Sequence, residues 1–333
     1  MNRSALERWL QTLWYGDSRL YLLLLPLSWL YCALVALRRT AYRIGLLPGR
    51  ALGCKVVVVG SLLVGGSGKT PLVIALARAL ERRGLRVGIV CGGYRGRAAS
   101  WPVMVTPDTD PDEAGDEALL LAQKTGLPVA AGPGRVAAAR ALLQQEACDV
   151  LLCDDGLQHY ALKRDMEIVV VDAERGYGNG ACLPAGPLRE GRRRLRHVDA
   201  VVALGDAIEG ATTIMHYAGT DACKLQDPEQ CYALDAFAGQ NVHAVAGLGN
   251  PQRFFRQLLE AGIPVVAHAF ADHHRYSPAD LAFRDQYPVL MTEKDAVKCR
   301  PFSKPHWWVV PVEAQLDPAF EDWLAGAVDP REH

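Results

Sequence analysis

The sequence predicts an α/β protein with a larger domain on a mostly parallel sheet, a smaller second α/β domain and an N-terminal membrane helix. Short runs of apolar, often β-branched residues alternate with stretches of helical periodicity, which is typical of a parallel sheet with helices on both faces. A shorter, more polar stretch divides this alternation into two parts. An uncharged apolar segment near the N-terminus precedes both parts.

Composition indicates a globular protein of roughly two domains. The chain has 333 residues, of which 50% are hydrophobic and 22% are charged, and its formal net charge is −1. Because that charge gives no overall field that attracts nucleic acid, we expect no nucleic-acid partner, and no pattern indicates an obligate protein partner. The nine cysteines include no CxxC pair, so the sequence predicts neither a zinc site nor a disulfide framework, as in a reducing compartment.

The N-terminal apolar segment, residues 20–37, contains 18 residues without a charge. As a helix it would measure about 27 Å, close to the thickness of the hydrocarbon core of a bilayer. Arg19 precedes it, Arg38 and Arg39 follow it, and Pro26 is expected to kink it. This pattern predicts that residues 1–45 form a membrane anchor.

The mode of anchoring has alternatives. A cleaved signal peptide is disfavoured, because the run ends on Arg38 and Arg39 rather than on the small residues of a cleavage site. A helix that lies in the membrane interface stays open beside a spanning helix, since Pro26 and the minimal length both weaken the spanning assignment. Four basic residues and no acids between positions 38 and 50, against three basic residues before the run, favour a cytosolic catalytic domain.

The two parts of the alternation are assigned by periodicity and by turn residues. In the first part we expect strands at 55–59, 87–90, 128–130, 149–153, 168–171 and 200–203, and helices at 72–80, after Gly115 and at 136–145. The polar stretch is interpreted as a hairpin or linker. In the second part we expect strands at 242–246, 265–270, 288–292 and 307–312, and a helix at 252–261. The expected domains after the anchor are therefore 46–210, a β linker at 211–240, and 241–333.

A glycine-rich loop between the first strand and the first helix predicts phosphate binding. The loop reads Gly60-Ser-Leu-Leu-Val-Gly-Gly-Ser-Gly-Lys-Thr70, in the strand–loop–helix context of a P-loop. Its glycines let backbone N–H groups converge on phosphate oxygens, its lysine would reach the outer phosphates and its threonine would bind Mg²⁺. The candidate nucleotide contacts are Gly65, Gly66, Ser67, Gly68, Lys69 and Thr70. The loop is atypical, because Leu63 stands where the usual spacing has glycine.

Two acids at the end of a later apolar strand, Asp154 and Asp155, complete the predicted nucleotide site. In P-loop proteins an acid at such a strand end contributes to the Mg²⁺ shell. Paired acids after a strand also occur as turn or helix caps, but a P-loop upstream favours the metal role. The sequence does not say which of the two acids touches the metal. ATP and Mg²⁺ are the expected cofactors, in a larger domain of the P-loop NTPase type.

Together with the glycine loop, Asp154-Asp155-Gly-Leu-Gln158-His159 resembles the tetraacyldisaccharide 4′-kinases, the lipid A 4′-kinases of Gram-negative bacteria. The resemblance covers nearly the whole chain and includes GGYRGR at 92–97, Gly-Asp-Glu at 115–117, LPAGPLRE at 183–190, FADHH at 270–274 and MTEKDAVK at 291–298. It implies ATP-dependent phosphorylation of the 4′-hydroxyl of a tetraacylated glucosamine disaccharide 1-phosphate to give lipid IV(A). The implied location is the inner membrane, with its lipids as partners and the catalytic domains on the cytoplasmic face.

The resemblance also implies roles for individual residues. Asp116 would be the catalytic base, assisted by His273 across a cleft between the domains, and Lys69 would act on the transferred phosphate. Thr70, Asp154, Asp155 and Glu117 would hold Mg²⁺. From the residues alone, Asp116 also fits a helix N-cap and His273 also fits a loop histidine.

Further candidates come from basic and polar residues near these motifs. By resemblance to the family, Arg189 would contact phosphate of ATP or of the substrate, a role that suits a guanidinium group because it binds phosphate bidentately. The neighbouring basic residues fit either a solvated face, the usual role of such a run, or contacts with anionic lipid headgroups; they are Arg192, Arg193, Arg194 and Arg196. Arg95, Gln158 and His159 are weaker candidates. Residues 292–295, Thr-Glu-Lys-Asp, allow a nucleotide or interdomain role, with salt-bridged surface charge as the simpler interpretation.

Two other functions compete with the lipid kinase. One is a membrane-associated P-loop NTPase that acts as a switch or assembly factor, with no small-molecule acceptor; Val64 disfavours it, because that class carries lysine at this position. The other is a scaffold that binds nucleotide only for stability. Acyl-chain specificity, oligomeric state, adenine contacts and domain closure do not follow from the sequence.

Overall fold

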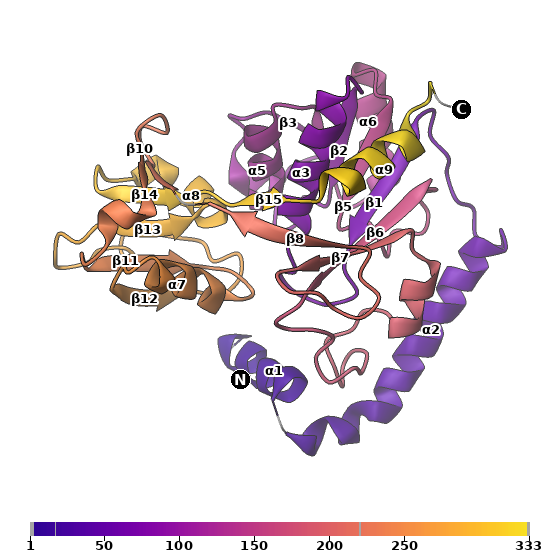
Figure 1. The fold of residues 1–333 in the computed structure, drawn as a ribbon. Coiled ribbons are helices and arrows are strands. Elements are labelled where there is room, and N and C mark those ends of the chain that lie inside the picture. Colours follow the sequence, from indigo (N-terminus) through magenta and orange to yellow (C-terminus); the bar gives the residue numbers. More distant parts are fainter. Residues whose placement is uncertain (1–2, 17, 220, 332–333) are drawn as a thin grey trace.

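The computed structural model describes residues 3–16, 18–219 and 221–331. They form two α/β bodies, each around one sheet, with two N-terminal helices beside the larger body (Figure 1). This architecture confirms the predicted class of a mostly parallel sheet followed by a smaller α/β unit.

The larger sheet has the strand order β15-β8-β7-β6-β1-β5-β2-β4-β3. Its strands are β1 (Lys55–Gly60), β2 (Val87–Cys91), β3 (Val103–Val105), β4 (Val129–Ala131), β5 (Val150–Asp154), β6 (Met166–Asp172), β7 (Ala200–Leu204), β8 (Thr213–Ala218) and β15 (Glu313–Gln315). Only the two edge strands, β3 and β15, pair antiparallel with their neighbours. The central strands are parallel, so their carboxyl ends meet at one edge of the sheet, and the glycine loop follows β1 there.

Helices cover both faces of this sheet, which explains why its central strand is apolar throughout. Val57 and Val59 of β1 pack into one core with the helices of the first face, whereas Val56 and Val58 pack into a second core on the opposite face. A strand buried on both faces reads as a continuous β-branched run. The helices are α3 (Lys69–Arg82), α5 (Asp116–Thr125) and α9 (Pro318–Val328) on the first face, α6 (Arg135–Gln145) on the second, and the short α4 (Pro111–Ala114).

The N-terminal helices lie along the larger body. They are α1 (Arg3–Tyr15), the 3-10 helix η1 (Arg19–Leu24) and α2 (Leu25–Arg43) (Figure 1). Pro26 lies in the first turn of α2, where its missing N–H breaks no bond, so it begins the α-helix instead of kinking its interior as expected. Among the described residues, 19–43 is the one helical stretch long and apolar enough to cross a membrane, and 6% of its apolar window is buried.

The smaller sheet has the order β10-β9-β14-β13-β11-β12. Its strands are β9 (Asp221–Lys224), β10 (Cys231–Ala233), β11 (Val242–Ala246), β12 (Val265–Ala269), β13 (Val289–Thr292) and β14 (Trp307–Val310). Helix α7 (Pro251–Glu260) packs on one face and α8 (Glu293–Cys299) on the other. The 3-10 helices of the rest of the chain are η2 (Arg192–His197), η3 (Leu234–Phe237) and η4 (Arg300–Phe302).

The chain passes between the two sheets twice, once after β8 and once before β15, and these two strands are antiparallel neighbours. Helix α9 then packs on α3, with Phe320 and Leu324 in the core of the larger body. The hairpin β9–β10, within the expected linker 211–240, belongs to the smaller sheet, whereas β15 and α9, within the expected domain 241–333, belong to the larger body. Periodicity cannot show this, because it reports the type of an element and not the sheet that it joins.

Candidate active site

The glycine loop forms the connection between β1 and α3 that its sequence predicts. Gly65 and Gly68 have φ values of 99° and 88°, in the left-handed region that a side chain disfavours. Lys69 and Thr70 stand in the first turn of α3, and Lys69 Nζ donates to the carbonyl oxygen of Gly65 at 3.4 Å. Ser67 is buried, and its Oγ has no hydrogen-bond partner among the described residues. The loop therefore presents backbone amides and a helix N-terminus, a suitable setting for phosphate.

Asp154 is the last residue of β5 and pairs in register with Val59 of β1, which places it beside the glycine loop. Thr70 Oγ1 donates to Asp154 Oδ2 at 3.0 Å. The other oxygen, Oδ1, is buried and has no hydrogen-bond partner in the described part of the chain. Burial raises the pKa of Asp154 to about 7, and the negative charge of Glu117 adds to this rise. An unpartnered carboxylate oxygen next to the P-loop threonine fits a Mg²⁺ ligand.

Asp155 has a different environment from its neighbour. Its carboxylate accepts two hydrogen bonds from Arg189 Nη1, at 2.9 and 3.0 Å, and lies 3.7 Å from Lys69 Nζ. Burial alone would raise the pKa of Asp155, but the charges of Lys69 and Arg189 outweigh it and hold this pKa well below its usual range. Asp155 is therefore ionised and joins the loop lysine to Arg189.

The acids near the loop do not form a metal cage of their own. Among the described residues no group of three or more histidine, cysteine, aspartate or glutamate side chains is placed to hold a metal ion. Mg²⁺ in nucleotide sites keeps water and phosphate ligands and needs only one or two carboxylates, which fits Thr70 and Asp154. Glu117 lies close enough to raise the pKa of Asp154, yet its Oε1 accepts a hydrogen bond from Lys294 Nζ at 3.0 Å.

Asp116 and His273 meet across the two bodies. Asp116 begins α5 of the larger body, and His273 lies in the loop after β12 of the smaller body. His273 Nδ1 lies 2.9 and 3.0 Å from the two carboxylate oxygens of Asp116. Their side chains are only 10% and 7% exposed. Asp116 Oδ1 also accepts the N–H of Glu117 at 2.9 Å, but Asp116 is not the N-cap of α5: that position is Gly115, and no side chain caps the helix.

The charge state of Asp116 follows from its neighbours. Burial would raise the pKa of Asp116, but the hydrogen bond with His273 and the charge of Lys294 lower it to about 2. Lys298 Nζ lies 3.6 Å from Asp116 Oδ2 and acts in the same direction. Asp116 is thus an ionised carboxylate in a buried position, which can accept a proton.

The backbone is strained at three of the candidate residues. Among the described residues, Arg95, Asp155 and His273 are the non-glycine residues with positive φ, at 63°, 49° and 58°. Such conformations are uncommon and concentrate at functional sites. Arg95 Nη1 donates to the backbone oxygen of His273 at 2.5 Å, so this arginine supports the histidine loop from the larger body.

Arg189 is held beside the glycine loop by backbone bonds. Its N–H donates to the carbonyl oxygen of Leu62 at 2.6 Å, and Val64 N–H donates to Pro187 at 3.0 Å. Gln158 links this segment to the acids, because its Nε2 donates to Glu190 at 2.9 Å and its Oε1 accepts from Arg189 at 3.3 Å. Burial and nearby arginines lower the pKa of His159 to about 4, so its half-buried ring is uncharged near neutral pH.

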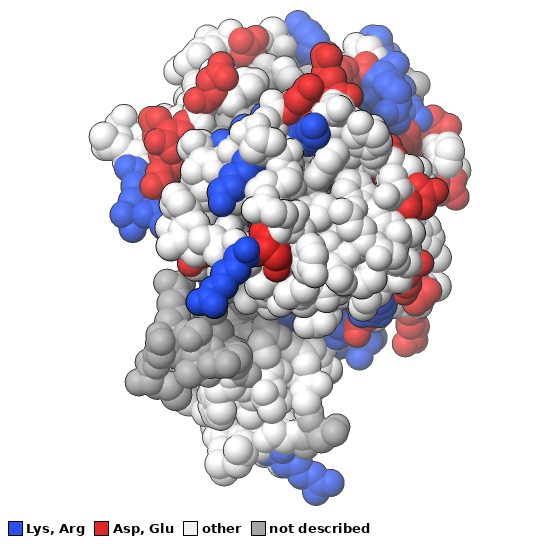
Figure 2. All heavy atoms as spheres, turned by 90° about the vertical axis from the view of Figure 1, so that its left-hand side faces the viewer, with Lys and Arg blue, Asp and Glu red and all other residues white. Residues whose placement is uncertain are grey.

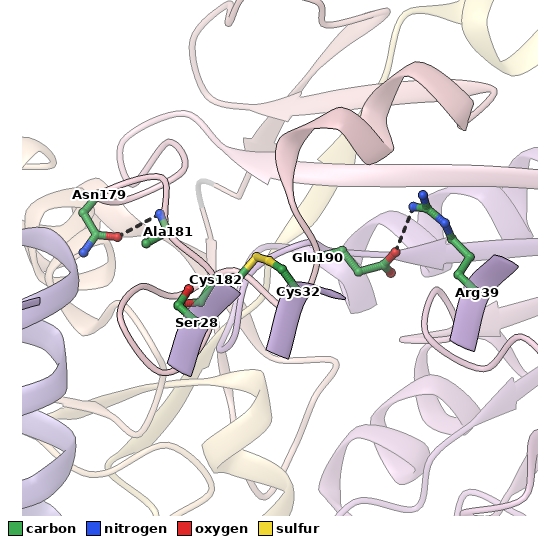
Figure 3. The surroundings of a disulfide bond; sticks show 7 residues. All are labelled: Ser28, Cys32, Arg39, Asn179, Ala181, Cys182 and Glu190. Carbon is green, nitrogen blue, oxygen red and sulfur yellow. Dashed lines mark hydrogen bonds and ion pairs between the residues drawn. A yellow bond between two sulfur atoms is a disulfide. The ribbon is translucent and has the colours of Figure 1, made fainter. Parts of the chain in front are cut away.

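Helix α2 contacts the segment 182–190, which contains Arg189 (Figure 3). Ser28 Oγ donates to the carbonyl oxygen of Cys182 at 2.7 Å, Cys32 forms a disulfide with Cys182, and Arg39 pairs with Glu190 at 3.4 Å. From α1, Trp14 Nε1 donates to the carbonyl oxygen of Pro184 at 3.1 Å. The N-terminal helices and the glycine loop thus contact the same short segment.

The expectation of no disulfides is wrong, since the structure contains Cys32–Cys182 and Cys223–Cys231. The first pair is 150 residues apart in the sequence and meets only because α2 docks on the larger body. The second pair stands opposite in the antiparallel pairing of β9 with β10. Local spacing motifs detect neither situation.

A family model described as Tetraacyldisaccharide-1-P 4'-kinase matches residues 20–329. The chain belongs to this family. Curated relatives named tetraacyldisaccharide 4'-kinase include those of Methylobacillus flagellatus, 48% identical over 96% of this chain and 95% of the relative, and of Nitrosococcus oceani, 49% identical over 92% and 90%. That of Hahella chejuensis is 48% identical over 94% of each. These matches confirm the resemblance found in the sequence.

A solved structure of the family has the same fold. LpxK from Aquifex aeolicus, crystallised in complex with ATP, superposes with a TM-score of 0.77 at 29% identity, over 93% of this chain and 98% of that one. The fold class and the membership of a kinase family are therefore established for this chain by independent comparisons.

Sequence reasoning missed several buried charged residues of this family member. For the Thr-Glu-Lys-Asp segment, salt-bridged surface charge was the simpler interpretation and a nucleotide or interdomain role was the alternative. Asp295 is fully buried and Lys294 reaches across to Glu117 of the larger body, which agrees with an interdomain role. Lys294 and Lys298 stand four residues apart on one face of α8, a spacing that could have indicated a shared target. Arg135 is buried and donates to the backbone oxygens of Asp154 and Asp155 at 3.3 and 3.4 Å. No sequence motif indicates this role.

Proposed function

We propose that this protein transfers the γ-phosphate of ATP to the 4′-hydroxyl of a tetraacyldisaccharide 1-phosphate. Family membership supports the reaction, and one observation in the structure carries it: an ionised, buried aspartate bonded to a histidine lies near a P-loop. Transfer of phosphate to a hydroxyl group needs a residue that takes the hydroxyl proton. A site that only binds the phosphates of a nucleotide needs no such residue.

On the donor side, the backbone amides of Gly65–Thr70 would hold the β- and γ-phosphates, with Lys69 released from the Gly65 carbonyl oxygen toward them. Thr70 and Asp154 would hold Mg²⁺, which neutralises charge on the transferred group when bound. Asp155 would keep Arg189 beside the phosphates, because the two form a hydrogen-bonded ion pair. This division assigns direct metal contact to Asp154, whose second oxygen lacks a partner among the described residues.

On the acceptor side, Asp116 would take the proton of the 4′-hydroxyl group as the hydroxyl oxygen attacks the γ-phosphorus. ADP would leave with the electron pair of the broken P–O bond. His273 would orient Asp116 through the hydrogen bond from Nδ1. Both groups come from one chain, which supports a transfer without an obligate protein partner.

We further propose that α2 lies in the plane of the membrane interface rather than across the bilayer. Its inner face is docked on the larger body at Ser28, Cys32 and Arg39, from its first to its last turns. Its outer face exposes Leu27, Leu30 and Leu34 by more than half. A helix fixed along its length to a water-soluble body can bury only its outer face in lipid.

The charge distribution of the surface supports this orientation. Among the described atoms in the view of Figure 2, charged side chains are spread over the upper part of the molecule and are sparse at the lower end, where η1 and the start of α2 lie. In η2, Arg192, Arg193 and Arg196 are exposed and would meet anionic headgroups, but Arg194 is buried against Glu167 and Glu190 and would not. The basic residues that flank the apolar run favour the cytoplasmic face of the inner membrane.

Mass analysis of the product made from Mg-ATP and a defined tetraacyldisaccharide 1-phosphate tests the reaction. We expect one added phosphate on the 4′-hydroxyl. Release of inorganic phosphate from ATP, with no phosphorylated acceptor from a folded enzyme, would contradict the kinase and favour an NTPase switch.

Membrane attachment is tested with the triple variant Leu27→Glu, Leu30→Glu and Leu34→Glu. Because these side chains are exposed, charge there should spare the fold but oppose insertion into lipid. We expect the variant to lose sedimentation with anionic vesicles, whereas the control Leu259→Glu, on the exposed face of α7, keeps it. Equal sedimentation of the triple variant and the wild type would contradict attachment through this face.

A further inference from the structure

A buried lysine contacts the histidine of the Asp116–His273 pair on the side away from the aspartate. Lys294 belongs to α8 of the smaller body, and its side chain is 14% exposed. Its Nζ lies 3.0 Å from His273 Nε2, 3.0 Å from Glu117 Oε1 and 3.1 Å from Asp272 Oδ1. The ammonium group has three protons, and these contacts supply one acceptor for each.

The contact with His273 decides which ring nitrogen carries the proton. A protonated lysine can only donate, so His273 Nε2 must accept with its lone pair. Burial would lower the pKa of Lys294, but the carboxylates of Glu117 and Asp272 outweigh it and raise this pKa, so the lysine is charged. With Nε2 as an acceptor, the ring proton lies on Nδ1, the nitrogen that faces Asp116 at 2.9 Å.

We propose that Lys294 is a positioning residue that fixes His273 in the tautomer with its proton on Nδ1, so that the ring donates to Asp116. This inference rests on the proposed roles of Asp116 and His273. In the alternative tautomer, with the proton on Nε2, that proton would point at the ammonium group, and Nδ1 would turn a lone pair toward a carboxylate. Neither contact would be a hydrogen bond.

The other neighbours of His273 do not fix its tautomer. Glu117 Oε1 and Asp272 Oδ1 lie 3.7 Å from Nε2, beyond hydrogen-bond distance, and both are bonded to Lys294 instead. The ring of Tyr94 packs edge-on at 4.8 Å between centroids, and Arg95 contacts only the backbone oxygen of His273. Lys298 faces Asp116 and Asp295, not the histidine ring.

The tautomer can be measured directly on the folded wild-type enzyme. With ¹⁵N-labelled histidine, NMR coupling between the ring nitrogens and the ring protons distinguishes protonated Nδ1 from protonated Nε2. Loss of the signal in His273→Ala assigns it among the nine histidines. We expect Nδ1 to be protonated and Nε2 to carry a lone pair. A protonated Nε2 in the wild type would overturn the proposal without any variant of Lys294.

A double-mutant cycle then tests whether Lys294 acts through His273. In Lys294→Met we expect kcat to fall about 10- to 100-fold, because the ring is no longer held toward Asp116, with little change in the KM for ATP. In the His273→Ala background, the same substitution should change kcat by less than about twofold, because the two losses are not additive. Equal losses in both backgrounds would overturn the proposal.

Lys124→Met is the matched control. Lys124 Nζ pairs with Glu293 Oε1 at 2.5 Å at the same contact between α5 and α8, and no hydrogen bond or ion pair in the described residues joins its side chain to His273. If Lys294 served only to hold the two bodies together, the two variants would lose kcat equally, which would contradict the proposal. A His273→Ala variant with full turnover would instead refute the proposed role of the histidine, while the NMR result for Lys294 would stand.

Discussion

The two acidic sites of this kinase are assembled in different ways. Asp154 ends a strand that pairs directly with β1, and Asp155 follows it, so the sheet of one body brings both to the glycine loop. Asp116 and His273 are 157 residues apart and come from different bodies. The first site belongs to a single folded unit, whereas the second exists only while the two bodies are in contact. The proposed nucleotide binding and the proposed proton acceptance therefore depend on different parts of the fold.

Contacts on two sides keep the bodies together. On one side, Lys294 of the smaller body meets Glu117 of the larger. On the other, Arg253 of α7 pairs with Asp172 at 2.6 Å, and a side chain at Gly249 would begin 2.8 Å from the backbone nitrogen of Gly66. The smaller body thus lies directly against the glycine loop, and glycine is required at this close approach.

The largest effect on turnover is expected when the Asp116–His273 pair loses its carboxylate. Asp116→Ala should lower kcat about 10²- to 10⁴-fold, the usual contribution of a general base, and should leave ATP affinity nearly unchanged because the glycine loop is intact. Steady-state kinetics and ATP-binding calorimetry on the same preparation check this. An equal loss of ATP affinity would show that the two sites are not separable.

Substitutions in the glycine loop should affect the nucleotide site instead. Lys69→Ala should lower turnover about 10²- to 10³-fold and weaken ATP binding as well, because a positive charge on the phosphates is lost in both the ground and the transition state. Thr70→Ala should instead raise the Mg²⁺ concentration needed for half-maximal rate. Titration of ATP and of Mg²⁺ separates the two variants, and unaltered requirements for both would contradict these assignments.

A weaker contact between the two bodies should have a smaller effect on activity, and this effect should differ between the Asp116–His273 site and the glycine loop. Arg253→Ala leaves the buried carboxylate of Asp172 without its partner and should lower the free energy of unfolding by about 1–3 kcal/mol. We also expect a larger loss in acceptor phosphorylation than in ATP binding. Arg256→Ala removes a more exposed pair with Glu174 and serves as the control, with a change of less than about 0.5 kcal/mol in denaturant unfolding. If both variants behave alike, Arg253 does not hold the bodies together.

The smallest effect is expected for Arg39→Ala. The arginine side chain is 31% exposed and lies 3.4 Å from Glu190, so its ion pair is partly screened by solvent. We expect thermal unfolding to report a loss of no more than about 1 kcal/mol. Because Glu190 also contacts Gln158 and Arg194, the segment that carries Arg189 should stay in place, and ATP affinity should be retained. A large drop in ATP affinity would mean that this single pair positions Arg189.

The same division explains what the sequence could predict. The glycine loop, the strands around it and the pair Asp154–Asp155 lie in short segments with strong local patterns, so residue spacing was sufficient to find them. Asp116 and His273 could be named only through the family resemblance, because their contact joins distant segments. The partners of Lys294 and the role of Arg135 could not be found for the same reason: each is a buried charge whose partners lie elsewhere in the sequence. The return of β15 and α9 to the larger body likewise depends on packing that no local pattern records.

The docking of α2 on the segment 182–190 has a consequence for engineering. Because Ser28 and Cys32 contact Cys182, and Arg39 contacts Glu190, α2 helps to position the segment around Arg189 and, as the proposed membrane anchor, is not interchangeable with another helix. A chimera in which a foreign membrane helix replaces residues 19–43 would still reach the bilayer. It would nevertheless lose the contacts of α2 with the segment that carries Arg189, the proposed phosphate contact, so attachment to the membrane and competence for transfer would separate in such a protein.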